Sequence, residues 1–240
     1  MVVGAGEVGS AIIKIEQEAG NTVYISDINS APSTKIDYDV MNICIPYSDK
    51  FEDIITDYIN TYNPTLTIIH STVKVGTTHN IQKRIKDCYI VHSYVRGVHP
   101  HLYEGIKTFT KYVGSDYDSA KIALKHYLEL GLHGHYLGTS KESELAKLMS
   151  TMYYGWNILF AKETKRMCNK FGLDYTNVYT IPNLSYNSGY TELRKENVVR
   201  PVLTPPSKKI LGHCVSQNVE LLPETLFTDI FKELNEYDLD

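Results

Sequence analysis

Blocks of apolar and polar residues alternate along the first half of the chain. Short apolar runs rich in valine and isoleucine end at turn residues, which is typical of strands buried on both faces of a parallel sheet. They predict strands at residues 1–3, 22–26, 40–45, 66–70, 89–92, 111–113 and 135–137. Apolar residues that recur every three or four positions predict intervening helices, one carrying Val8 to Ile15 and others at 51–62, 77–86 and 119–130.

The pattern changes in the second half. Apolar residues at helical spacing predict one long helix over 141–171, which Gly172 ends. After Pro182 we expect a loop-rich stretch up to Cys214, followed by a final helix from about 223 to 237. The whole pattern predicts an α/β protein. A Rossmann-like, doubly wound parallel sheet with right-handed crossovers would occupy residues 1–138, and a mainly helical domain would occupy residues 139–240.

Composition narrows the range of partners. The net charge is −4 and no basic run is present, which argues against a nucleic-acid partner. No apolar run approaches the roughly 20 residues that span a bilayer, and the chain does not open on a secretion signal, so we expect a cytoplasmic protein without a membrane contact. The cysteines are widely spaced, which predicts neither a disulfide framework nor a zinc site, and we expect no metal at His99-Pro100-His101.

The stretch Gly4-Ala5-Gly6-Glu7-Val8-Gly9 lies between the first strand and the first helix. This spacing is the dinucleotide fingerprint: the first glycine allows the turn, the second lets a diphosphate approach, and the third lets the helix pack on the strand. Asp27 ends the second strand, where an acidic residue accepts the ribose hydroxyls and repels a 2′-phosphate. We therefore predict NAD as the cofactor. Because only three residues precede the turn, the first strand should be short.

Three further positions are candidates for chemistry, each with a simpler interpretation beside it. Ser71 and Thr72 follow a strand at the edge where parallel sheets bind ligands, although such a pair also commonly caps a helix. Lys147 and Thr151 share one face of the long helix, although a lysine there can simply extend to water. Cys214 follows the flexible Gly212 and is a candidate nucleophile, although free cysteines are more often buried filler.

Taken together, these motifs resemble the nucleotide-sugar dehydrogenases, the family of UDP-glucose and GDP-mannose 6-dehydrogenases. The matching stretches occur in family order and at roughly family spacing from one end of the chain to the other. They are Gly4 to Gly9, Cys44-Ile45-Pro46, Ser71-Thr72-Val73 with Gly76, Glu144-Leu145-Ala146-Lys147-Leu148, and Gly212-His213-Cys214-Val215.

The resemblance implies oxidation of a sugar primary alcohol to a carboxylate by two NAD molecules in turn, as in polysaccharide biosynthesis. It assigns Cys214 as the nucleophile that holds the aldehyde, Lys147 as the charge that stabilises the oxyanion, and Thr72 as the residue that positions a water. Separately from the resemblance, the length of the helix over 141–171 on so small a catalytic domain predicts that it also serves as the interface of a homodimer. The cofactor-binding residues would be Gly4, Gly6, Glu7, Val8, Gly9, Asp27, Pro46, Ser71 and Thr72.

The chain also departs from the family pattern. Val95 stands where the family usually has a glutamate, Thr151 where it has an asparagine, and Asn218 where it has an aspartate. Thr151 and Asn218 remain in our predicted catalytic set, but Asn218 cannot accept a proton as an aspartate can, which affects thioester hydrolysis. We also expect the chain to lack the family's C-terminal nucleotide-binding domain, and the sequence does not decide whether another chain supplies it.

Two alternatives remain open. The first is a dehydrogenase of the β-hydroxyacid type, which shares the glycine turn, a Ser-Thr loop and a helical lysine but performs one oxidation and needs no cysteine. The second is a protein that binds NAD without turnover, which the lost carboxylates and the missing domain would explain.

Overall fold

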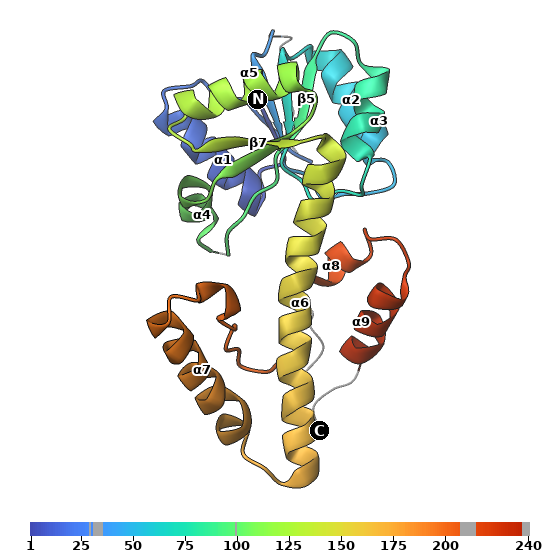
Figure 1. Cartoon of the computed structure of the whole chain (residues 1–240). Helices are drawn as coiled ribbons and strands as arrows, with labels where there is room; N and C mark the ends of the chain where they lie inside the picture. Colours follow the sequence, from blue (N-terminus) through green and yellow to red (C-terminus); the bar gives the residue numbers. More distant parts are fainter. Residues whose placement is uncertain (29, 31–35, 99, 207–214, 237–240) are drawn as a thin grey trace. The chain divides into compact units, whose positions relative to one another are not determined.

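A computed structural model describes residues 1–28, 30, 36–98, 100–206 and 215–236 (Figure 1). The chain divides into two compact units, Met1–Lys147 and Leu148–Asp240, and the boundary falls inside helix α6 (Ser140–Phe171). The domain division that the sequence predicts, between residues 138 and 139, stays a prediction, because compactness does not show that either unit folds alone.

The first unit contains a seven-stranded sheet in the order β2-β1-β3-β4-β5-β6-β7. The predicted α/β class, with a mostly parallel sheet followed by a helical region, is confirmed. The first strand is short, as expected, because only two of its residues pair with their neighbours. The strands are β1 (Val2–Val3), β2 (Ile25–Ser26), β3 (Val40–Ile43), β4 (Leu66–Ile69), β5 (Tyr89–His92), β6 (Lys111–Gly114) and β7 (Gly134–Gly138).

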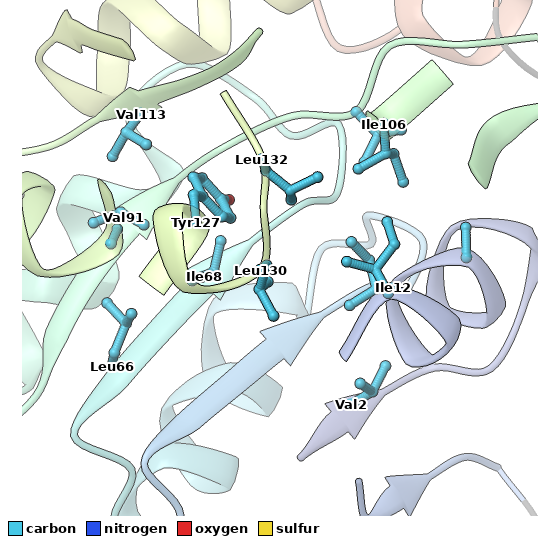
Figure 2. Close-up of a cluster of buried hydrophobic side chains, with 14 of the residues drawn as sticks. Val2, Ile12, Leu66, Ile68, Val91, Ile106, Val113, Tyr127, Leu130 and Leu132 are labelled. Atoms are coloured by element: carbon cyan, nitrogen blue, oxygen red, sulfur yellow. The ribbon is translucent and has the colours of Figure 1, made fainter. Parts of the chain in front are cut away.

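Helices cover both faces of this sheet, because successive strand residues point to opposite faces and each face is apolar. Val2, Leu66 and Ile68 pack with α1 (Glu7–Glu18), α4 (Leu102–Thr108) and α5 (Tyr117–Glu129) in one core, which Figure 2 shows. Val3 and Ile69 pack with α2 (Phe51–Tyr62) and α3 (Thr77–Arg84) in the other. The sheet therefore has the two helical layers of a doubly wound fold.

One sequence prediction for this sheet is wrong. β6 runs antiparallel to β5, with His92 opposite Gly114, whereas β7 is parallel to β6. The connection from β5 to β6 contains a helix that the sequence pattern did not predict, α4, which has seven residues and is about 10 Å long. So short a helix does not cross the sheet as a parallel connection requires, so the chain re-enters at the edge it left.

The second unit is helical, as predicted, with a core of Met152, Leu159, Val215, Val219 and Phe231. The expected loop-rich stretch is wrong at its start, because Pro182 lies in the first turn of α7 (Ile181–Glu192), where proline is compatible with a helix. Residues 199–206 have neither helix nor strand, as expected. No described helix is apolar and long enough to cross a bilayer. The remaining elements are a π-helical turn η1 (Thr176–Thr180), a 3₁₀ turn η2 (Glu196–Val198), α8 (Val215–Val219) and α9 (Leu226–Glu236).

Candidate functional site

The glycine turn has three different environments at its three glycines. Gly4 has φ 91°, and a Cβ there would lie 2.9 Å from the Cys44 carbonyl oxygen. A Cβ at Gly9 would lie 1.8 Å from the Gly4 carbonyl oxygen, so α1 can approach the turn only with glycine there. Gly6 has nothing within 4 Å of its Cβ position and caps α1. The open side of the turn, at the helix N-terminus, is where an anionic group would bind.

Asp27 is held against this turn by the backbone. Its Oδ2 accepts a hydrogen bond from Ala5 N at 2.8 Å, and its Oδ1 accepts one from Ile28 N at 2.6 Å. These two hydrogen bonds lower the pKa of the Asp27 carboxyl, so the group is ionised at neutral pH. Glu7 and Val8 form the first turn of α1, Glu7 exposed and Val8 packed on the core.

The loop after β4 is tied to the loop after β3. Ser71 Oγ donates to Ile45 O at 2.6 Å, whereas Thr72 is half-buried and Pro46 is exposed. The helix-cap interpretation of the Ser-Thr pair is wrong, because the N-cap residue of α3 is Gly76 and no side chain of its own loop caps it. Ser71 thus joins two carboxyl-end loops of the sheet, and Thr72 lies on that edge.

The first turns of α6 hold these loops in place. Glu144 is fully buried and accepts hydrogen bonds from Gly76 N at 2.5 Å and Thr78 N at 2.8 Å, so it caps α3 from another helix. Burial raises the pKa of Glu144, and the hydrogen bonds oppose this shift. One residue earlier, Ser143 Oγ lies 2.8 Å from His92 Nδ1, at the end of β5. Sequence reasoning matched Glu144 to a motif but did not identify this role.

Lys147 follows one turn later on the same helix. Its Nζ donates to Val95 O at 3.1 Å and lies 6.0 Å from the centre of the Tyr94 ring. The ammonium is therefore turned toward the loop after β5, which does not support the interpretation that it extends to water. The Val95 side chain is buried and apolar, so this loop supplies no acid or base at that position.

The other predicted catalytic residues belong to the second unit. Thr151 and Asn218 are buried, and Asn218 Nδ2 donates to Thr151 Oγ1 at 3.2 Å. The structure thus pairs two of the three residues that depart from the family pattern. Cys214, with Gly212 and His213, lies outside the described residues.

Two buried polar residues of the first unit were missed by sequence reasoning. Lys111, at the start of β6, donates to Ser93 O and Tyr94 O, and His70 directly follows β4 beside it. A lysine that opens an apolar strand gives no signal in the sequence for what it binds, because its partners are main-chain carbonyls. Among the described residues, no group of three histidines, cysteines or acidic residues is placed to hold a metal ion.

Comparison with known proteins shows that the chain is similar to dehydrogenases. No protein-family model matches the chain. The chain is 25% identical over 221 residues to UDP-N-acetyl-D-mannosamine dehydrogenase of Methanocaldococcus jannaschii, an alignment that covers 90% of this chain and 47% of that protein. The chain therefore spans about half the length of this curated relative.

Solved structures show the same fold. A UDP-D-ManNAc dehydrogenase from Pyrococcus horikoshii superposes with a TM-score of 0.76 at 18% identity, covering 98% of this chain and 68% of that chain. A 3-hydroxyisobutyrate dehydrogenase from Mycobacterium tuberculosis superposes with a TM-score of 0.72 at 18% identity, covering 100% and 94%. The resemblance to the N-terminal portion of the nucleotide-sugar dehydrogenases is confirmed, and the chain has a dehydrogenase fold.

The cap on α3 gives a direct stability test. Glu144→Ala removes both acceptors and leaves Gly76 N and Thr78 N unpaired in a buried place, so we expect a loss of about 1–3 kcal/mol in the free energy of unfolding. Urea denaturation measures it. The matched control is Glu129→Ala, which removes an exposed carboxylate that pairs with Lys125 at 3.8 Å and should cost under about 0.5 kcal/mol. Equal losses in the two variants would show that Glu144 is not the cap we describe.

Proposed function

We propose that the chain is an NAD-dependent oxidoreductase of the nucleotide-sugar 6-dehydrogenase type, which oxidises a sugar primary alcohol to a carboxylate. The observation that carries the proposal is the pairing of an open glycine turn beside an ionised Asp27 with a lysine ammonium turned toward the loop after β5. Both features belong to the carboxyl edge of one sheet, where α/β proteins bind ligands. The sequence similarity to a UDP-N-acetyl-D-mannosamine dehydrogenase supports this choice of substrate class.

The cofactor would lie across the glycine turn. The space beside Gly6 and the N-terminus of α1 suit a diphosphate, and the Asp27 carboxylate suits the adenosine ribose hydroxyls while repelling a 2′-phosphate. The loops that carry Pro46, Ser71 and Thr72 would line the same edge. When bound, NAD supplies the hydride acceptor for each oxidation.

The protein's own residues would supply nucleophile and charge. The Cys214 thiolate would add to the aldehyde carbon, and the resulting adduct would lose hydride to become a thioester that water hydrolyses. Lys147 would stabilise each oxyanion by its charge, a role that its present hydrogen bond to a carbonyl oxygen supports. Thr72 would position the attacking water.

Hydrolysis would be the weak step. A general base must accept a proton, but the paired Asn218 amide and Thr151 hydroxyl cannot do so at neutral pH, and Val95 offers no carboxylate. We therefore propose that this chain forms the cysteine adduct more readily than it releases an acid.

A second candidate is a dehydrogenase of the β-hydroxyacid type. The fold match to the Mycobacterium tuberculosis 3-hydroxyisobutyrate dehydrogenase covers 94% of that chain, which supports this candidate. Such an enzyme would use Lys147 without Cys214. A protein that binds NAD without turnover is the remaining alternative.

We also propose that α6 forms a homodimer. Tyr153, Phe160 and Met167 follow one another at intervals of seven residues and are each at least 60% exposed, as is Phe171 one turn later. Residues at this spacing form a single stripe along a helix, and such a stripe suits a helix of a second copy.

The apolar stripe on α6 predicts the oligomeric state. Light scattering should show a dimer at micromolar concentration, and Phe160→Asp should convert it to a monomer because a charge would be buried at the interface. Asn169→Asp, an exposed position on the opposite side of the same helix from Phe160, is the matched control and should leave the dimer intact. A wild-type protein that stays monomeric at high concentration would contradict the proposal.

The Asp27 carboxylate predicts cofactor preference. The wild-type protein should bind NAD at least about tenfold more tightly than NADP, and Asp27→Ala should weaken NAD binding about tenfold by removing a charged hydrogen-bond acceptor. Isothermal titration measures both affinities. Asp57→Ala, an exposed carboxylate on α2, should change neither. Equal affinities for NAD and NADP in the wild type would refute the assignment.

Cofactor stoichiometry separates the three functions. A panel of nucleotide sugars and free sugars should give two NADH per oxidised sugar in the wild type, and Cys214→Ala should abolish the second oxidation. Cys88→Ala, which alters a thiol beside Thr67, is the control and should retain both. One NADH per substrate in both the wild type and Cys214→Ala would indicate the β-hydroxyacid type. Tight NAD binding without any turnover would indicate a binding protein.

A further inference from the structure

Lys111 is a buried lysine that the proposed chemistry does not use. Its side chain is 2% exposed, and its Nζ donates to Ser93 O at 2.7 Å and to Tyr94 O at 2.9 Å. The third neighbour is His70 Nδ1 at 3.3 Å. An ammonium has three N–H donors, and here it meets three acceptors.

The acceptor role of His70 follows from its other neighbour. Asn42 Nδ2 lies 2.9 Å from Glu16 Oε1, which can only accept, so Asn42 Oδ1 faces His70 Nε2 at 2.8 Å as an acceptor. His70 Nε2 therefore carries the proton, and burial holds the pKa of His70 well below its usual value, so the ring is neutral and Nδ1 has the lone pair that faces Lys111. Nδ1 also lies 3.0 Å from Ser93 O, so the Lys111 ammonium donates to two adjacent acceptors that would otherwise repel each other. The donors run in one direction from Lys111 through His70 and Asn42 to Glu16.

The series of hydrogen bonds from Lys111 to Glu16 has a buried charged group at each end. Burial alone would raise the pKa of Glu16, but hydrogen bonds from His126, Asn21 and Asn42 lower it, so the carboxylate is ionised. Burial lowers the pKa of Lys111 to about 7. Cys44 would oppose that shift only as a thiolate, and burial raises its pKa to about 12. The titratable and charged groups that face Lys111 from the surrounding elements are His70, His92, Cys44, Tyr127, Arg96 and Lys147.

The carbonyls that Lys111 binds lie directly before the one that Lys147 binds. Ser93 O and Tyr94 O accept from Lys111, and Val95 O accepts from Lys147. We propose that Lys111 is a positioning residue, whose ammonium fixes the Ser93–Tyr94 backbone so that Val95 O meets the ammonium of Lys147. The proposal rests on the proposed function only in taking Lys147 as the catalytic charge.

Trace acetylation tests this arrangement without substrate or cofactor. The full-length protein is treated with a trace of acetic anhydride at pH 6.5, and mass spectrometry gives the acetylation of Lys147 relative to exposed Lys125. In Lys111→Met the Val95 carbonyl is no longer fixed, so this ratio should rise about fivefold, the factor expected for one lost hydrogen bond. Hydrogen exchange at residues 93–96 should rise locally by a similar factor. Lys111→Arg, which keeps a charge and donors, should restore much of both, and Lys121→Met on α5 is the matched control.

A pH series tests whether the charge of Lys111 is what fixes this backbone. A lysine that only fills space would not make the acetylation ratio or the exchange of residues 93–96 change near its own pKa. A neutral amine has only two N–H donors, so in the wild type the acetylation ratio and the corrected exchange of residues 93–96 should both rise across pH 7. Lys111→Arg should show no such step. Unchanged ratios in Lys111→Met, or faster exchange throughout the first unit, would overturn the proposal. Should Lys111→Met not fold, the wild-type pH series and Lys111→Arg decide. A failure of the proposed function would appear instead as absent turnover with these readouts intact.

Discussion

The carboxyl edge of the sheet depends on one buried carboxylate. Glu144 reaches from α6 to satisfy two N–H groups at the start of α3, and no lysine or arginine side chain hydrogen-bonds it among the contacts seen in the described residues. A buried carboxylate is tolerated there because the helix N-terminus offers aligned N–H donors and a favourable dipole. Since Ser143 and Lys147 are on the same turns of α6, this cap also sets where they meet the loops that follow β5.

The direction of β6 is the second constraint. Lys111 is the first residue of this strand, and in an antiparallel strand the first residue lies at the carboxyl edge of the neighbouring β5. In the fully parallel sheet that the sequence pattern predicts, the same lysine would lie at the opposite edge, away from Ser93 and Tyr94. Because the short α4 connection makes β6 antiparallel, Lys111 as well as Lys147 can bind carbonyl groups of the loop after β5.

Sequence periodicity was sufficient for elements that pack on one core. The helix at 51–62 and the strand at 89–92 have the predicted bounds because their apolar faces are complete. Periodicity was not sufficient where an element does not pack on a core or where a side chain binds the main chain. α7 has no buried residues, so no buried apolar face marks it in the sequence, and the proline at its start predicted a loop instead. The glycine turn and Asp27 could be found because backbone geometry requires those residue types, whereas Lys111 binds main-chain carbonyls that any residue could provide.

The balance of charge on the loop after β5 bears on the two steps of the proposed chemistry, adduct formation and hydrolysis. The loop after β5 meets the ammonium groups of Lys111 and Lys147, while the family's carboxylate position holds Val95. Carbonyl dipoles stabilise these cations without neutralising them, so the surrounding field favours anions such as a thiolate or an oxyanion. The same field disfavours a protonated base. This loop is therefore better suited to stabilising a negative charge than to accepting a proton, which is the asymmetry on which the proposed function rests.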